Sequence, residues 1–191
     1  KLGVPDSFTL TAIVAIFLVA GTVKGVIGMG LPAVSLAFLT VLLDLPTAIA
    51  LMVVPSLITN FWQALVGGNG LAILSRLPVF FFLAIGGVWV GGKALLSIDL
   101  SLLSALLGFL LILYGASGLA NFRINVANSQ EAWAGPVAGF VNGVFTGMTG
   151  SFVFPGVLYL QALGLKRDEL IQGMGILFVV STISVAGSLY S

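Results

Sequence analysis

The sequence predicts an all-α, polytopic membrane protein: a helix bundle of two inverted repeats with broken or re-entrant helices. Three observations predict it. First, 59% of the 191 residues are hydrophobic and only 7% are charged, whereas a soluble domain carries about 25% charged residues. Second, the apolar runs are long and continuous, unlike the short alternating segments of an outer-membrane barrel. Third, the chain contains 25 Gly and 7 Pro residues, which favours closely packed helices that are interrupted within the membrane.

The composition also limits the chemistry available to the chain. The seven Lys and Arg residues nearly balance the six Asp and Glu residues, so no basic surface is available for nucleic acid. The sequence contains no Cys and no His, which excludes disulfides, thiol nucleophiles, histidine bases and zinc–histidine sites. It shows no nucleotide-binding motif and no paired carboxylates inside an apolar run. We therefore expect a protein that is not an enzyme and uses neither a metal nor a cofactor.

The first apolar run is too long for a single crossing of about 20 residues. Gly28, Gly30 and Pro32 interrupt it, because glycine and proline make a continuous helix improbable there. The run therefore predicts a full helix over about 8–27, a break, and a half-helix or re-entrant segment over about 33–43.

Three full spans are predicted to follow in the first half. The first covers about 47–66 and contains Pro55, which is expected to kink it. Residues 67–70 are expected to form a loop because three of the four are glycine. The remaining two spans cover about 78–96 and 100–119.

The second half is expected to repeat the same order of elements. It has a short apolar run, a break, a second short run with a proline, and a full span. These elements are 135–148, the break at 149–151, 152–163 and 170–190.

An internal repeat supports this division. Residues 20–26 and 138–144 are identical at five of seven positions. We expect a first transmembrane repeat at 1–120, a connector loop at 121–134 and a second repeat at 135–191. Five crossings in the first half, an odd number, would start the second copy on the opposite side of the membrane and so invert it. Paired broken helices in two such repeats are typical of secondary transporters. The second repeat lacks counterparts of the last two spans, so we expect it to be incomplete at its C-terminus.

The two breaks are the first candidate site. Unwound backbone at membrane depth is tolerated only where it is buried or lines a cavity, and its N–H groups and the following helix N-terminus can bind an anion. A purely structural break is the alternative. The candidate substrate-binding residues are Gly28, Met29, Gly30, Thr149, Gly150 and Ser151, and the candidate hinges are Pro32, Pro55 and Pro155.

Lys24 is the one charge well inside an apolar run. A cation at the centre of a bilayer costs roughly 2.5–3.5 kcal/mol on insertion scales, so it usually has a partner or a function. No carboxylate lies within helical reach of Lys24 in the sequence, and an anionic ligand is a candidate partner. The alternative is that Lys24 snorkels to the membrane interface. Its counterpart in the second repeat is Asn142, which is neutral but still a hydrogen-bond donor.

A polar stripe on the 47–66 span is the next candidate. Ser56, Thr59, Asn60 and Gln63 occupy positions i, i+3, i+4 and i+7, which places them on one helix face. Such a stripe must face protein or water in a membrane. Either Asn60 and Gln63 donate hydrogen bonds to a bound anion, or the stripe forms hydrogen bonds between helices.

Glycine at every fourth position forms one face of the predicted 135–148 helix. A face of small residues lets another helix approach closely, so these residues indicate packing. The set is Gly135, Gly139, Gly143 and Gly147, and its counterparts in the first half are Gly21 and Gly25.

Two blocks of the sequence resemble the TauE/SafE family of sulfite and organosulfonate exporters. The first is Lys24–Pro32 with Pro55, Asn60 and Gln63, and the second is Gly139–Gly143 with Thr149, Gly150 and Pro155–Leu160. The resemblance covers roughly 21–63 and 135–190. Residues 151–155 depart from the Gly-Pro-rich run associated with the family.

The resemblance implies a secondary transporter, and specifically an exporter, of a small sulfur-containing anion such as sulfite or an organosulfonate. It implies a multi-pass protein of the bacterial inner membrane. The paired repeats with broken helices predict alternating access around a mid-membrane site. The expected partners are the small anionic substrate and the lipid bilayer, without nucleic acid, and formation of a homo-oligomer stays open. Two alternatives also stay open: a small-anion channel, and a non-transporting membrane scaffold or assembly protein.

Overall fold

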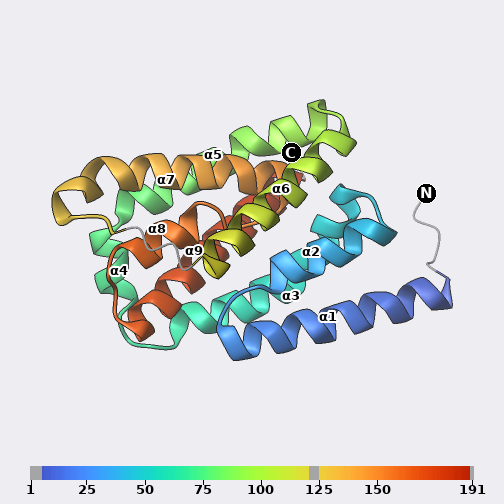
Figure 1. Cartoon of the computed structure of the whole chain (residues 1–191), viewed down its shortest axis with the longest axis horizontal. Coiled ribbons are helices and arrows are strands. Elements are labelled where there is room, and N and C mark those ends of the chain that lie inside the picture. Colours follow the sequence, from blue (N-terminus) through green and yellow to red (C-terminus); the bar gives the residue numbers. More distant parts are fainter. Residues whose placement is uncertain (1–5, 121–124, 190–191) are drawn as a thin grey trace.

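The computed structural model describes residues 6–120 and 125–189, and every regular element in them is an α-helix (Figure 1). In chain order the helices are α1 (Ser7–Ile27), α2 (Leu31–Leu42), α3 (Leu45–Leu65), α4 (Gly70–Arg76), α5 (Pro78–Ser97), α6 (Leu100–Leu119), α7 (Asn128–Thr149), α8 (Gly156–Ala162) and α9 (Arg167–Leu189).

Five helices of the described residues are long and apolar enough to cross a membrane, namely α1, α3, α5, α6 and α9. Helix α2 is equally apolar but has only 12 residues, fewer than the roughly 20 that a crossing needs. The predicted all-α, polytopic membrane fold is therefore confirmed.

The first break lies where the sequence predicts it. Helix α1 ends at Gly28, whose φ of 80° lets its N–H bond the carbonyl of Lys24 at 2.7 Å. Gly30 (φ 105°) then precedes α2. Both conformations favour glycine, because a side chain is strained there. Pro32 lies in the first turn of α2, where its missing N–H leaves no hydrogen bond unmade.

Two predicted boundaries are wrong, and one helix has no counterpart among the predicted elements. The predicted connector, 121–134, is helical from residue 128 onward, because the polar residues there form the first turns of α7. The second short helix covers Gly156–Ala162 instead of 152–163, since Pro155 precedes its first turn. Helix α4 occupies Gly70–Arg76, a segment with no helix prediction.

Pro55 does not break its helix, contrary to the hinge prediction. Helix α3 continues through it from Leu45 to Leu65. Thr59 bonds the carbonyl of Pro55 through its hydroxyl at 2.9 Å, so the turn after the proline is hydrogen-bonded. The proline removes the N–H that would bond the Leu51 carbonyl four residues earlier, and membrane helices tolerate prolines of this kind within packed bundles.

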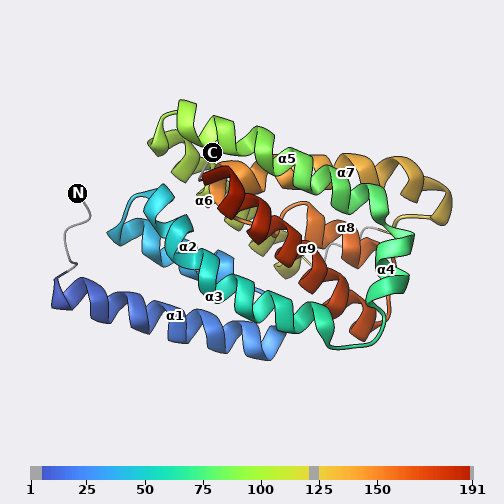
Figure 2. The same cartoon turned by 180° about the vertical axis from the view of Figure 1, so that it is seen from behind.

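Two pairs of helices organise the bundle. Helices α5 and α7 lie side by side and run in the same direction, whereas α3 and α9 lie side by side in opposite directions (Figures 1 and 2). Helices α7 and α9 end toward the side of the bundle where α1 and α3 begin (Figure 1). This reversal is what an inverted repeat requires, while the duplication itself stays a prediction.

The α5–α7 pair packs backbone against backbone. A Cβ atom at Gly139, Gly143 or Gly147 would lie only 2.1–2.3 Å from a carbonyl oxygen of α5. The acceptors are those of Phe80, Ala84 and Val88, spaced by four residues like the glycines. The packing role predicted for the glycine face of α7 is therefore confirmed.

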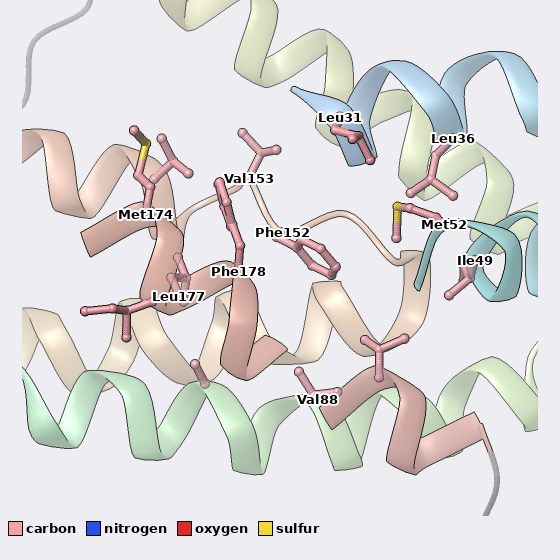
Figure 3. Packing of buried hydrophobic residues seen from close by; sticks show 14 of the residues in the cluster. Leu31, Leu36, Ile49, Met52, Val88, Phe152, Val153, Met174, Leu177 and Phe178 are labelled. Atoms are coloured by element: carbon pink, nitrogen blue, oxygen red, sulfur yellow. The ribbon is translucent and has the colours of Figure 1, made fainter. Parts of the chain in front are cut away.

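The core joins both breaks to the full spans. Leu31 at the start of α2 belongs to the same buried cluster as Met52 of α3 and as Phe152 and Val153 of the second break (Figure 3). The rings of Phe152 and Phe178 lie 6.0 Å apart between their centroids. Both break segments are thus held by packing on the central helices.

Substituting Gly143→Ala is expected to destabilise the protein by about 1–3 kcal/mol, the usual cost of overpacking. The added methyl would meet the carbonyl oxygen of Ala84 at 2.1 Å, which forces α5 and α7 apart. Thermal unfolding in detergent measures the effect. Gly115→Ala on α6 is the control, because a Cβ there has no atom within 4 Å; an equal effect of both substitutions would contradict the packing account.

Substituting Asp44→Ala is expected to cost about 1 kcal/mol, because Asp44 caps α3. Its carboxylate accepts from the Thr47 N–H at 2.9 Å, and this hydrogen bond lowers the pKa of Asp44. The contribution is present above the ordinary Asp pKa of about 4 and is lost as the pH falls through the lowered value. Unfolding of Asp44→Ala and the wild-type protein at neutral and acid pH should therefore converge at acid pH.

Candidate functional site

Lys24 lies on the last turns of α1 and is 7% exposed. It is the one buried charged residue of the described chain, and its ammonium nitrogen donates to Asn60 Oδ1 on α3. The nitrogen also lies 5.5 Å from the centroid of the Phe178 ring on α9, within the range of a cation–π interaction. Lys24 therefore points into the bundle and does not snorkel, so that alternative prediction is wrong.

A chain of hydrogen bonds extends from Lys24 across the bundle. Asn60 Nδ2 donates to Thr182 Oγ1 at 3.3 Å, and the Thr182 hydroxyl donates to the Phe178 carbonyl at 2.6 Å. Asn60 and Thr182 are both fully buried. Because α1, α3 and α9 each contribute one side chain, the network links the first half of the chain to the second.

Gln63 and Gln172 form a reciprocal contact between α3 and α9. The Gln63 side-chain N–H donates to the Ile171 carbonyl at 2.8 Å, and the Gln172 side-chain N–H donates to the Ala64 carbonyl at 2.8 Å. Gln172 Oε1 also accepts from the Asn69 N–H at 2.7 Å. The polar stripe on α3 thus forms hydrogen bonds between helices, as one of its two predicted roles requires.

Five buried side-chain polar atoms of the described residues have no hydrogen-bond partner. In low dielectric such atoms are costly, so they mark places where a ligand or water can bind. They are Ser56 Oγ, Gln63 Oε1, Asn142 Nδ2, Tyr159 Oη and Ser181 Oγ.

The first break is closed by its own contacts. The Gly28 N–H donates to the Lys24 carbonyl. The Tyr114 hydroxyl of α6 donates to Met29 Sδ at 2.8 Å. No side chain caps α2 after Gly30. The first turn of α2 therefore keeps backbone donors without a side-chain cap.

The second break also uses most of its polar groups internally. The Gly150 N–H bonds the Thr146 carbonyl at 2.7 Å, and the Thr149 hydroxyl donates to the Phe145 carbonyl at 2.7 Å. The Ser151 N–H donates to Thr149 Oγ1 at 3.3 Å. The expectation of free backbone N–H groups is thus wrong at Gly28, Gly150 and Ser151, because left-handed glycines turn these donors back onto the preceding helix.

Asn142 of α7 lies beside the start of α8. Its Oδ1 accepts from the Gly156 N–H at 3.0 Å, while its Nδ2 is buried without a partner. A Cβ at Gly156 would lie 2.7 Å from Asn142 Oδ1, so the approach requires glycine. No hydrogen bond among the described residues joins Asn142 or the second break to Lys24.

The structure brings together only part of the predicted site. Lys24, Gly28 and Gln63 line one open groove of about 910 Å³ between α1 and α3. Asn60 is not part of the groove wall but accepts a hydrogen bond from Lys24. The other lining residues are Gly21, Gly25, Ile58, Thr59, Phe61, Trp62, Leu65, Val66 and Ile171.

An ion pair between Arg76 and Glu131 joins α4 to the first turn of α7. The nearest nitrogen and oxygen lie 2.5 Å apart, and the hydrogen bond to Glu131 raises the pKa of Arg76. Neither this ion pair nor the Gln172 contact was predicted from the sequence. The sequence predicts which residues share a face of one helix, but both of these contacts join segments far apart in the chain.

The fold and this interior define a class: a multi-pass membrane protein with broken helices that holds, among the residues the structure describes, one cation inside the bundle against neutral side chains. The model of the family described as "Sulfite exporter TauE/SafE" matches residues 13–191. The chain therefore belongs to the TauE/SafE family of sulfite exporters, a family of membrane transporters, which agrees with the expectation that it is not an enzyme. No curated protein and no solved structure matches the chain significantly.

Substituting Gln172→Leu is expected to destabilise the protein by about 1–2 kcal/mol. The Ala64 carbonyl and the Asn69 N–H each lose a partner, and hydrogen bonds between membrane helices have about this combined value. Thermal unfolding measures the loss. Gln161→Leu on the exposed surface of α8 is the matched control, and equal stability of the two variants would contradict the proposed weight of the α3–α9 contact.

Proposed function

We propose that the protein exports a small sulfur-containing oxyanion, sulfite or an organosulfonate, and that Lys24 is the cation that binds it. The observation that carries the proposal is a buried ammonium held only by neutral groups. Its contacts are the Asn60 oxygen and the Phe178 ring, and the one ion pair of the described residues is elsewhere, between Arg76 and Glu131.

The electrostatics favour an anion at this place. A buried cation without a counter-charge is costly, and the cost falls when an anion neutralises it. Asp6, Asp44 and Asp99 stand at helix N-caps, and Glu131, Asp168 and Glu169 lie in first turns. None of them is buried, so a small anion entering the bundle is the natural counter-charge for Lys24.

Two unpartnered hydroxyls can complete the site. Ser56 lies one turn before Asn60 on α3, and Ser181 precedes Thr182 on α9; both oxygens are buried and have no partner. Hydroxyl groups can donate to the oxygens of sulfite or a sulfonate. Together with Lys24 and Asn60, these groups come from both halves of the chain.

The remaining predicted residues belong to the same proposal in other roles. The backbone at Met29 and Gly30 and the start of α2 would face the anion with positive potential. Asn142 and the second break, with Thr149, Gly150 and Ser151, would form the opposing wall when the two halves move. Opposed movement of the halves would alternate access in the inner membrane of a bacterium, with Pro32 and Pro155 at the half-helix starts as pivots.

Substituting Lys24→Ala is expected to weaken sulfite binding roughly tenfold to a hundredfold, because a hydrogen bond to a charged group contributes about 1.5–3 kcal/mol. Asn60→Asp should cause a similar loss with Lys24 still present, because the new carboxylate would pair with the ammonium. Binding is measured by thermal shift and by isotope uptake into proteoliposomes, with sulfite, sulfoacetate, taurine, thiosulfate and sulfate.

The matched control is Lys93→Ala, since Lys93 is exposed on α5. Unchanged sulfite affinity in Lys24→Ala would overturn the assigned role. Counterflow of labelled anion supports a carrier, fast flux without counterflow would indicate a channel instead, and absence of both binding and flux would favour the scaffold alternative.

A further inference from the structure

The ion pair between Arg76 and Glu131 leaves part of the guanidinium free. Arg76 ends α4 and Glu131 lies in the first turn of α7, and their side chains are 40% and 16% exposed. Arg76 donates to both carboxylate oxygens, through Nε at 3.1 Å and Nη2 at 2.5 Å. A guanidinium has five N–H donors, so among the described residues three of them remain without an acceptor and can bind a second oxyanion.

A buried hydroxyl without a partner lies beside this ion pair. It belongs to Tyr159 of α8, which is 6% exposed and whose ring centroid lies 5.0 Å from that of Phe80. A Cβ at Gly135 would lie 2.8 Å from Tyr159 Oη, and Gly135 is four residues after Glu131 on α7. Since residues four apart share a helix face, the hydroxyl lies on the face of α7 that carries Glu131.

Tyr159 is also within electrostatic reach of Arg76. The hydrogen bond to Glu131 is the main cause of the raised pKa of Arg76, burial lowers this pKa, and Tyr159 and Glu169 add smaller raising effects. A buried hydroxyl without an acceptor is unfavourable. A carboxylate has about four lone-pair sites, so Glu131 can accept from Tyr159 as well as from Arg76.

This end of the bundle is the favourable side for an approaching anion. Helix α4 and the starts of α7 and α9 lie at this end, opposite the starts of α1 and α3 (Figure 1). Anions are repelled from an acidic surface, and the positive-inside rule places the end with more Lys and Arg in the cytoplasm. Among the described residues this end carries Arg76, Lys166 and Arg167 with Glu131, Asp168 and Glu169, whereas the other end carries Lys93 with Asp6, Asp44 and Asp99.

We propose that Arg76 is an outer binding site for the transported oxyanion at the cytoplasmic face, and that Glu131 and Tyr159 form the switch that frees it. The site rests on the proposed export of sulfite or an organosulfonate. Glu131 neutralises Arg76 while no anion is bound. An anion that binds the guanidinium replaces Glu131, and the released carboxylate accepts the hydrogen bond of the Tyr159 hydroxyl.

This exchange leaves each charged group with a partner in both states, which a low dielectric requires. It also gives the Tyr159 hydroxyl the acceptor that it lacks in the described state. Further along the same face of α7, Asn142 lies seven residues after Gly135 and holds the next unpartnered donor, Nδ2. An anion captured at Arg76 therefore has a second polar group ahead of it toward the second break.

Two substitutions with opposite expected signs separate this switch from a purely structural ion pair. Glu131→Gln removes the charge that competes for Arg76, so sulfite should bind about tenfold more tightly at the outer site. Tyr159→Phe keeps the ring and removes the group that receives the released Glu131, so sulfite should bind about tenfold more weakly. Without sulfite, Tyr159→Phe should be as stable as the parent protein or more stable, because an unpartnered buried hydroxyl is lost.

Both changes are measured by the sulfite-dependent thermal shift of the full protein that also carries Lys24→Ala, so that the inner site does not contribute. A weak shift should remain in Lys24→Ala and should disappear when Arg76→Ala is added. The matched control is Lys166→Ala, since Lys166 is an exposed cation at the same end. Sodium chloride at equal ionic strength controls for general screening of charge.

The outer site is wrong if Lys24→Ala shows no remaining sulfite shift, or if Lys166→Ala or sodium chloride reproduces the effect of Arg76→Ala. It is also wrong if Glu131→Gln does not tighten sulfite binding or if Tyr159→Phe leaves it unchanged. Lys24→Ala alone tests the proposed inner site, whereas the Arg76, Glu131 and Tyr159 variants test the outer one. The two proposals can therefore fail separately.

Discussion

The backbone contact between α5 and α7 is the interaction on which the arrangement of both halves depends. Lipid tails are as apolar as leucine, so membrane helices associate through close packing and hydrogen bonds, not through removal of apolar surface from water. Glycines at 139, 143 and 147 let the two backbones meet. Since α5 comes from the first half and α7 from the second, this contact fixes the second break against the first half, and the Arg76–Glu131 pair adds a polar link at the start of α7.

The buried charge of Lys24 imposes a second constraint on the interior. An ammonium group in a membrane interior needs polar neighbours. Helix α3 supplies Asn60 beside it, and α9 supplies the face of Phe178 and, through Asn60, Thr182. The same crossing of α3 and α9 contains the reciprocal Gln63–Gln172 contact. Polar side chains thus gather where two long helices from different halves cross, and the cation lies at that crossing.

The broken helices offer this site fewer unpaired backbone N–H groups than fully unwound segments would. Gly28 and Gly150 adopt left-handed conformations and return their N–H groups to the preceding helix. Helix ends that are closed in this way lose donors that an anion would otherwise use. The proposed recognition therefore depends mainly on side chains, above all Lys24, with the uncapped start of α2 as the backbone contribution.

The sequence by itself determined the class of fold, the five apolar spans, the first break and the place where the second begins, but not the length of the second, which runs to Pro155. It also identified Lys24 as a charge inside an apolar run. These features follow from apolar length, from glycine and proline positions and from an isolated charge, all of which are local. The sequence also placed Asn60 and Gln63 on one helix face, since helical spacing follows from residue number. Only the tertiary structure decided that Asn60 pairs with Lys24, that Gln63 meets the α9 backbone, and that α7 begins at Asn128 in the predicted connector. Those outcomes depend on which helices cross and how closely, and glycine contacts between segments far apart in the chain set both.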